Sequence, residues 1–180
     1  MTPDDLVLTP MGLRFRGRTY PCVIGRGGVS AGKREGDGAT PAGRHRIAGL
    51  LYRPDRLARP APWAQPIRPF DLWCDDPARP EYNLPVRAPF SGSHEAMRRA
   101  DPLYDIVLVT DWNWPEPVPG RGSCIFLHQW RRPGFPTAGC IALRRAHLRE
   151  IAAFAAPGTR LIVPPGAGRA PARAAQALQV

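Results

Sequence analysis

A histidine and a cysteine twelve residues apart are the side chains of this sequence best placed to do chemistry together. His128 follows the apolar run 125–127, and Cys140 comes directly after Gly139 at the start of a second apolar segment. A thiol is a competent nucleophile only as its thiolate, and a nearby imidazole is the usual means of forming one. A strand followed by a Pro/Gly turn predicts that the two side chains meet at one edge of a sheet.

The alternative interpretation is structural, because a cysteine among apolar residues is commonly a small buried hydrophobe and a single loop histidine commonly has no chemical role. Three features favour catalysis. Gly139 removes a side chain where a substrate carbonyl would approach the backbone. Residues 130–132 (Trp-Arg-Arg) suit an exposed rim. The backbone N–H groups that can converge on an oxyanion belong to Thr137, Ala138, Gly139 and Cys140.

The segment Thr137-Ala-Gly-Cys-Ile-Ala-Leu143, with Phe-Leu-His128 upstream, resembles the active-site signature of the YkuD-type L,D-transpeptidases. That signature is a His, a spacer, Ser/Thr-x-Gly-Cys and an apolar residue. The resemblance implies that Cys140 is the acylated nucleophile and His128 its base, with the backbone around Thr137, Ala138 and Gly139 holding the oxyanion and substrate. No third triad residue is evident, and a backbone carbonyl that orients His128 would suffice.

A weaker resemblance lies upstream, where residues 35–43 (Glu-Gly-Asp-Gly-Ala-Thr-Pro-Ala-Gly) are similar to the family's G-x-TP-x-G segment. We expect Gly36 to Gly43 to form a structural wall of the cleft. The loop charges are expected to be solvated groups that bind no ligand, namely Lys33, Arg34, Glu35 and Asp37. The chain departs from the family pattern at two positions. Ala138 stands where many members have a second His, and Ala142 where many have an Arg. Both departures concern the choice of donor and acceptor.

The activity implied by the resemblance is acyl transfer between peptidoglycan stem peptides through a cysteine thioester, without a cofactor or metal. A carbapenem is the implied type of inhibitor. Two alternatives stay open. With water as the acceptor, the same site would be an L,D-carboxypeptidase or endopeptidase, and without chemistry the fold would be a cell-wall binding module.

Length and composition predict one domain of short strands. The 180 residues include 23 prolines and 18 glycines, which excludes a helical bundle. We expect a mainly β fold, a sandwich or partly closed barrel of mixed strands with one or two short helices, as the resemblance also implies. The catalytic domain is expected over residues 1–165, and residues 166–180 are expected to form a flexible tail.

The net charge of +10 predicts attraction to polyanions. Nucleic acid is not the favoured partner, because the sequence lacks a zinc-finger, helix-turn-helix or aromatic RNA-binding signature. The four cysteines show no C-x-x-C pairing, so a metal site is not expected. Two disulfides are conceivable, but Cys22, Cys74 and Cys124 are expected to be buried thiols within apolar strands.

Localisation is ambiguous. Residues 1–6 show neither the basic nor the apolar region of a signal peptide, and no stretch is long and apolar enough for a transmembrane segment. Taken literally, this favours the cytoplasm, whereas the resemblance implies the periplasm or cell envelope.

Hydrophobic patterns place the elements around the site. An amphipathic helix is expected over 144–156, and a short helix is expected to open at Ser93, as its N-cap, and run to Met97. Tyr82 and Asn83 are expected at the rim of the groove. Strands are expected at residues 5–9, 13–16, 20–24, 45–52, 70–74, 105–110, 125–128 and 160–163.

Overall fold

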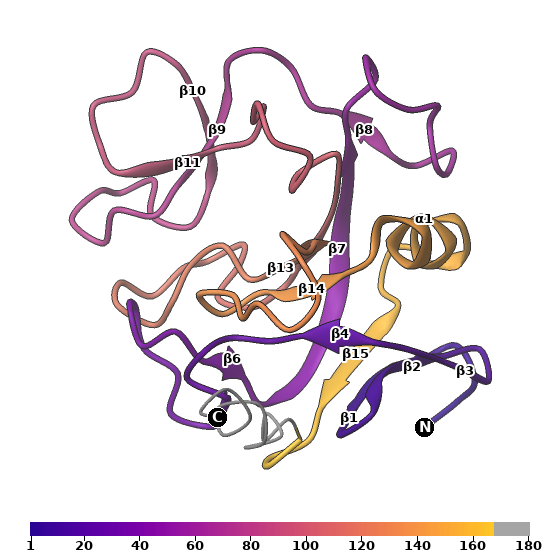
Figure 1. Cartoon of the computed structure of the whole chain (residues 1–180). Helices are drawn as coiled ribbons and strands as arrows, with labels where there is room; N and C mark the ends of the chain where they lie inside the picture. The colour runs from indigo at the N-terminus through magenta and orange to yellow at the C-terminus, as the bar shows by residue number, and fades with distance from the viewer. Residues whose placement is uncertain (168–180) are drawn as a thin grey trace, which may run out of the picture.

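The structure is a computed structural model that describes residues 1–167. It is mainly β, with a single α-helix in this described part of the chain (Figure 1). Both the fold class and the nearly closed, barrel-like sheet of mixed strands confirm the prediction. Residues 168–180, most of the predicted tail, lie outside the described residues.

A ten-stranded sheet makes up most of the fold, in the order β3-β2-β1-β15-β7-β12-β13-β14-β4, with β8 paired to β7. Its two end strands, β3 and β4, are consecutive in the chain and separated by Pro21 alone, so the sheet curls back on itself. Its strands are β1 (Leu6–Thr9), β2 (Gly12–Phe15), β3 (Arg18–Tyr20), β4 (Cys22–Val23), β7 (Gly43–Tyr52), β8 (Gln65–Pro66), β12 (Ile106–Thr110), β13 (Phe126–Gln129), β14 (Ile141–Leu143) and β15 (Arg160–Val163).

Strand β12 lies between two hydrophobic clusters, which is why all five of its residues are buried. Alternate side chains of a strand point to opposite faces, so Leu108 joins one cluster and Val109 the other. The first cluster is covered by helix α1 (Arg145–Phe154), which buries Leu148 and Ile151 against the sheet. The second cluster lies under the segment inserted between β7 and β12.

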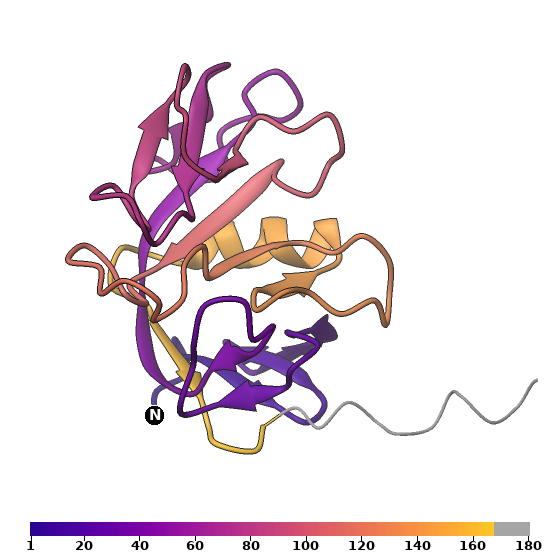
Figure 2. The ribbon, with the colours of Figure 1, turned by 90° about the vertical axis from the view of Figure 1, so that its left-hand side faces the viewer.

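The inserted segment forms a separate lobe above the main sheet (Figure 2). Its three-stranded sheet has the order β10-β9-β11, with β9 at Asp71–Cys74, β10 at Pro85–Arg87 and β11 at His94–Ala96. The predicted helix from Ser93 to Met97 is therefore wrong. Backbone pairing of His94 with Cys74 and of Glu95 with Trp73 outweighs the local capping signal.

The other predicted elements are found with small shifts. The hairpin of β1 and β2, the strands at β7, β9, β12 and β15, and helix α1 confirm the pattern-based predictions. The strand predicted over 20–24 is interrupted at Pro21, because proline cannot donate a ladder hydrogen bond. The loop expected between Gly25 and Gly43 contains only the two-residue strands β5 (Val29–Ser30) and β6 (Thr40–Pro41).

Candidate active site

Strands β13 and β14 bring the predicted histidine and cysteine onto one face of the sheet. The two strands run parallel, with His128 beside Ala142. Phe126 and Cys140 lie two residues before His128 and Ala142, respectively, and the Phe126 N–H donates a hydrogen bond of 3.4 Å to Cys140 Sγ. Because side chains alternate with a period of two, Cys140 and Ala142 share a face with Phe126 and His128. Ala142 and His128 line the same cavity.

His128 and Cys140 line the same cavity, which has a volume of about 440 Å³. Ala138 and Gly139 also line it, as do the predicted rim residues Trp130 and Arg131, whereas Arg132 does not. The structure therefore brings the predicted site residues to one opening. Its walls also contain groups that the sequence did not indicate as site residues, namely Asp75, Glu95, Arg99, Tyr104 and Cys124.

The Cys140 thiol is held by two backbone groups at the bottom of this cavity. It donates to the Cys124 carbonyl oxygen at 3.0 Å and accepts from the Phe126 N–H. Burial raises the pKa of the Cys140 thiol to about 12, opposed by the Phe126 hydrogen bond. At neutral pH the resting sulfur is therefore a protonated thiol, which needs a base before it can attack a carbonyl.

One backbone contact fixes the orientation of the His128 imidazole. Its Nδ1 lies 2.7 Å from the Gln129 carbonyl oxygen, which confirms the expectation of an orienting backbone carbonyl. Since a carbonyl oxygen only accepts hydrogen bonds, Nδ1 carries the hydrogen and Nε2 keeps the free lone pair. The ring is 8% exposed and packs edge-on against Tyr104, at 5.3 Å between centroids. Burial lowers the pKa of His128 to about 4, so the imidazole is neutral at pH 7.

The loop before Cys140 uses some of its N–H groups internally. The Thr137 N–H donates to the Ile24 carbonyl oxygen at 3.0 Å, and the Gly139 N–H donates to Thr137 Oγ1 at 3.1 Å. The same hydroxyl donates to the Cys140 carbonyl oxygen at 2.6 Å, which fixes the turn. Thr137 and Gly139 therefore shape the loop, although sequence reasoning gave their N–H groups to an oxyanion.

Gly139 is needed for a reason other than the predicted approach of a substrate. Its φ of +150° lies outside the range that side chains favour. A Cβ at this position would lie 3.0 Å from the Ala39 carbonyl oxygen and 3.1 Å from Ile125 Cδ1. The space in front of Gly139 is thus filled by the protein's own chain.

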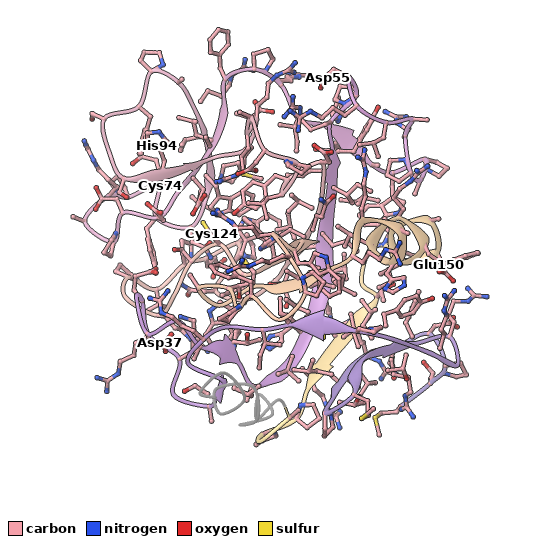
Figure 3. All side chains as sticks on the ribbon, in the orientation of Figure 1. Asp37, Asp55, Cys74, His94, Cys124 and Glu150 are labelled. Carbon is pink, nitrogen blue, oxygen red and sulfur yellow. The ribbon has the colours of Figure 1, made fainter. Side chains whose placement is uncertain are left out.

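Residues 36–43, the predicted wall, pack behind this loop, but none of them lines the cavity, so the expectation that they form a wall of the cleft is wrong. The buried Thr40 hydroxyl donates to the Gly139 carbonyl oxygen at 2.7 Å and accepts from the Gly25 N–H at 3.0 Å. One hydroxyl in β6 therefore joins the segment that follows β4 to the cysteine loop. The nearby Lys33–Asp37 ion pair has a distance of 2.7 Å, and Lys33 is buried, although the loop charges were expected to be solvated. Figure 3 shows Asp37 at the edge of the molecule.

Asn83 lies in the interior, at 2% exposure, although it was predicted at the rim. Its side-chain oxygen accepts from the Cys124 N–H at 3.0 Å and from Trp73 Nε1 at 3.0 Å. Because the Cys124 carbonyl accepts from the Cys140 thiol, Asn83 is connected to that thiol through one intermediate residue. Its φ of +55° is a conformation that asparagine tolerates better than most residues, which is the one local signal for this role.

Tyr82 was also predicted at the rim and is also buried. Its hydroxyl donates to Glu35 and accepts from the Gly122 N–H at 3.0 Å, and Ser123 Oγ donates to the same Glu35 oxygen at 2.8 Å. Glu35 therefore connects the wall to the inserted lobe and to the chain that leads to Cys124.

The remaining cysteines were expected to be buried, and the expectation holds for Cys74 but is wrong for Cys22 and Cys124, which are partly buried. All four are free thiols. Cys74 is buried in β9, and Cys22 is partly buried in β4. Cys124, expected in an apolar strand, precedes β13 and lines the cavity (Figure 3). Within residues 1–167 no group of three or more His, Cys, Asp or Glu side chains is arranged to hold a metal ion.

Comparison with known proteins gives one match. The family model of the YkuD L,D-transpeptidase catalytic domain matches residues 14–163, which include the wall, the inserted lobe and both candidate catalytic residues. Neither a curated protein nor a solved structure matches the chain.

Proposed function

Because the chain belongs to the YkuD family of L,D-transpeptidase catalytic domains, we propose that it transfers acyl groups between peptidoglycan stem peptides with Cys140 as the nucleophile. The observation that carries this proposal is the common cavity of His128 and Cys140, with the imidazole oriented by the Gln129 carbonyl and the thiol by the Cys124 carbonyl.

The first half of the reaction forms a thioester. Cys140 Sγ bonds to the carbonyl carbon of an L-residue that precedes a D-residue, while His128 Nε2 takes the thiol proton. The carbon–nitrogen bond then breaks, and His128 returns that proton to the departing amine of the D-residue. This order of steps starts from a neutral thiol and a neutral imidazole. The high pKa of the Cys140 thiol and the low pKa of the His128 imidazole disfavour a thiolate–imidazolium ion pair in the resting site.

The second half resolves the thioester. The acceptor amine bonds to the carbonyl carbon and gives one proton to His128, the carbon–sulfur bond breaks, and the proton returns to Sγ. We assign the oxyanion to the N–H groups of Ala138 and Cys140, because those of Thr137 and Gly139 are engaged within the loop. One such donor is worth about 3 kcal/mol of the barrier.

Hydrolysis is the second candidate function, since water in place of the amine would make the same site an L,D-carboxypeptidase or endopeptidase. The proposed place of action is the cell envelope, where the family's substrate lies. No helix of residues 1–167 has the length and apolar character needed to span a membrane.

The test is product analysis with a tetrapeptide stem and an amine acceptor. The protein as it stands is expected to release the terminal D-residue and form the cross-linked product. Cys140→Ala is expected to form neither, and Cys124→Ser, which changes a second thiol in the same cavity, is expected to keep activity. Product formation by Cys140→Ala would refute the proposal.

A further inference from the structure

The inserted lobe turns two carboxylates toward the nucleophile. Glu95 lies directly across from Trp73 in the β9–β11 pair, and Asp75 follows Trp73 by two residues, so all three share one face. Trp73 packs edge-on against Phe126 at 5.1 Å between ring centroids, and the Phe126 N–H contacts Cys140 Sγ. Both carboxylates line the Cys140 cavity. Figure 3 shows this lobe, marked by Cys74 and His94, next to Cys124.

These carboxylates are incompletely satisfied by the protein. Asp75 Oδ1 is buried and has no hydrogen-bond partner among the described residues. Among the described residues Glu95 is contacted by Arg99 at 3.4 Å, and the Tyr104 hydroxyl also favours its charged form, whereas Arg99 binds Asp101 through two bonds of 2.9 and 2.8 Å. Burial raises the pKa of the Glu95 carboxyl. A buried carboxylate oxygen without a donor is costly unless a ligand supplies one.

The other charges of the cavity are distributed differently. Glu35 is occupied by Tyr82 and Ser123. Arg26 and Arg131 are exposed at the opening. Arg99 also lines the cavity beside Glu95, and it is paired with Asp101. Asp75 and Glu95 therefore face a cavity whose exposed arginines lie at its opening, an arrangement that suits a peptide with carboxylates outside and a positive charge within.

We propose that Asp75 and Glu95 form a subsite that binds a primary ammonium group of the peptide substrate beside Cys140. The inference rests on the proposed function and adds the charge that the site selects. An ammonium group has three N–H donors and no acceptor, so it can satisfy both carboxylates at once. It belongs either to the side chain of the acyl donor or to the acceptor that resolves the thioester.

The experiment separates these two sources. In the donor arm, acylation of the protein is followed by intact mass with a tetrapeptide that has L-lysine before its terminal D-alanine, and with the same peptide acetylated on the lysine amine. In the acceptor arm, the acyl-enzyme is formed from the acetylated peptide. The ratio of its aminolysis by a lysine-containing peptide to its hydrolysis by water is then measured. Asp75→Asn, Glu95→Gln and the double variant are compared, with Glu81→Gln as the charge-matched control outside the cavity.

We expect the unmodified protein to favour the ammonium-bearing peptide over its uncharged alternative by about tenfold or more in one arm, and the double variant to lose that preference. Glu81→Gln should keep it. Because the readout is a ratio within one sample, partial unfolding of a variant cancels. An unchanged ratio in the double variant, or no preference in the unmodified protein, would overturn the subsite. Failure of the unmodified protein to form any adduct would instead refute the proposed function.

Discussion

The two hydrophobic clusters on either side of β12 and β13 are built from the same strands but differ in composition. The first contains mainly aliphatic side chains, such as Leu108 and Leu127, closed over by α1. The second contains the aromatic rings of Trp73, Tyr104 and Phe126, and both cavity cysteines border it. Neighbouring residues of one strand thus serve different purposes. One face supplies the buried aliphatic area that stabilises the fold, and the other orients reactive groups around an opening.

Cavity size does not identify the site. A larger cavity of about 750 Å³ lies behind Trp73, between the inserted lobe and β7. Its lining is rich in apolar residues and includes neither His128 nor Cys140. The smaller cavity is the candidate because the proposed nucleophile Cys140 and the proposed base His128 both line it.

The largest effect is expected at His128, the proposed general base, which packs against Tyr104 of the second cluster. Changing His128 to Asn removes the group that takes the thiol proton, and the rate of thioester formation is expected to fall by about 10²–10⁴-fold. Single-turnover mass spectrometry measures this rate. Changing His94, which lies exposed in the lobe, is the matched control and should leave the rate unchanged. Equal rates in His128→Asn and the unmodified protein would remove the histidine from the mechanism.

A pair of substitutions on the two faces sharpens the contrast. Leu108→Ala leaves a cavity in the first cluster and should lower the free energy of unfolding by about 2–5 kcal/mol, with turnover per folded molecule unchanged. Phe126→Leu should cost less stability but slow thioester formation, because the ring supports the chain that contacts the thiol. Denaturant unfolding and turnover, measured on both variants, test whether stability and activity depend on different faces of the sheet. Equal loss of turnover in both would show that the two faces are not separable.

Acid should lower the free energy of unfolding through protonation of His128, which packs against Tyr104 of the second cluster. Its pKa in the folded state is about 4, below the ordinary 6.5, so between these values the unfolded chain binds more protons. Stability is therefore present above pH 6.5 and lost as the pH falls toward 4, by about 3 kcal/mol for this group. Unfolding free energies measured across this range should show a shallower decline in His128→Asn. Identical pH profiles would contradict burial of a neutral imidazole.

The smallest effect should come from the wall. Thr40→Val keeps the shape of the side chain but leaves the Gly139 carbonyl and the Gly25 N–H without their hydroxyl partner. We expect about 2 kcal/mol of lost stability. Ser30→Ala, a hydroxyl in the neighbouring strand β5, is the comparison, and its hydroxyl binds only the local Gly32 N–H. Thermal unfolding that fails to distinguish the two variants would remove Thr40 from its bridging role.

Sequence patterns were sufficient where local signals and the fold agree. The alternation of β7, the apolar run of β12 and the spacing of α1 predict those elements directly. The sequence also predicted that His128 and Cys140 share one opening, because their motif is short and local. The helix expected at Ser93 failed because a strand pairing that is distant in sequence overrode a capping signal.

The positioning residues were out of reach for the same reason. Asn83 reaches Cys124 across 41 positions of sequence, and Thr40 reaches Gly139 across 99. Nothing near Asp75 or Glu95 in sequence indicates that β9 and β11 turn them toward Cys140. Contacts of this length depend on how the lobe docks, which no periodicity encodes.

The most direct test of the central claim is to locate the covalent adduct. The protein is incubated with a tetrapeptide stem, or with a carbapenem, then digested, and the modified peptide is identified by mass spectrometry. The expected result is one acyl group on Cys140, absent from Cys140→Ala and formed far more slowly in His128→Asn. An adduct on Cys22, Cys74 or Cys124, or no adduct on the unmodified protein, would contradict the account.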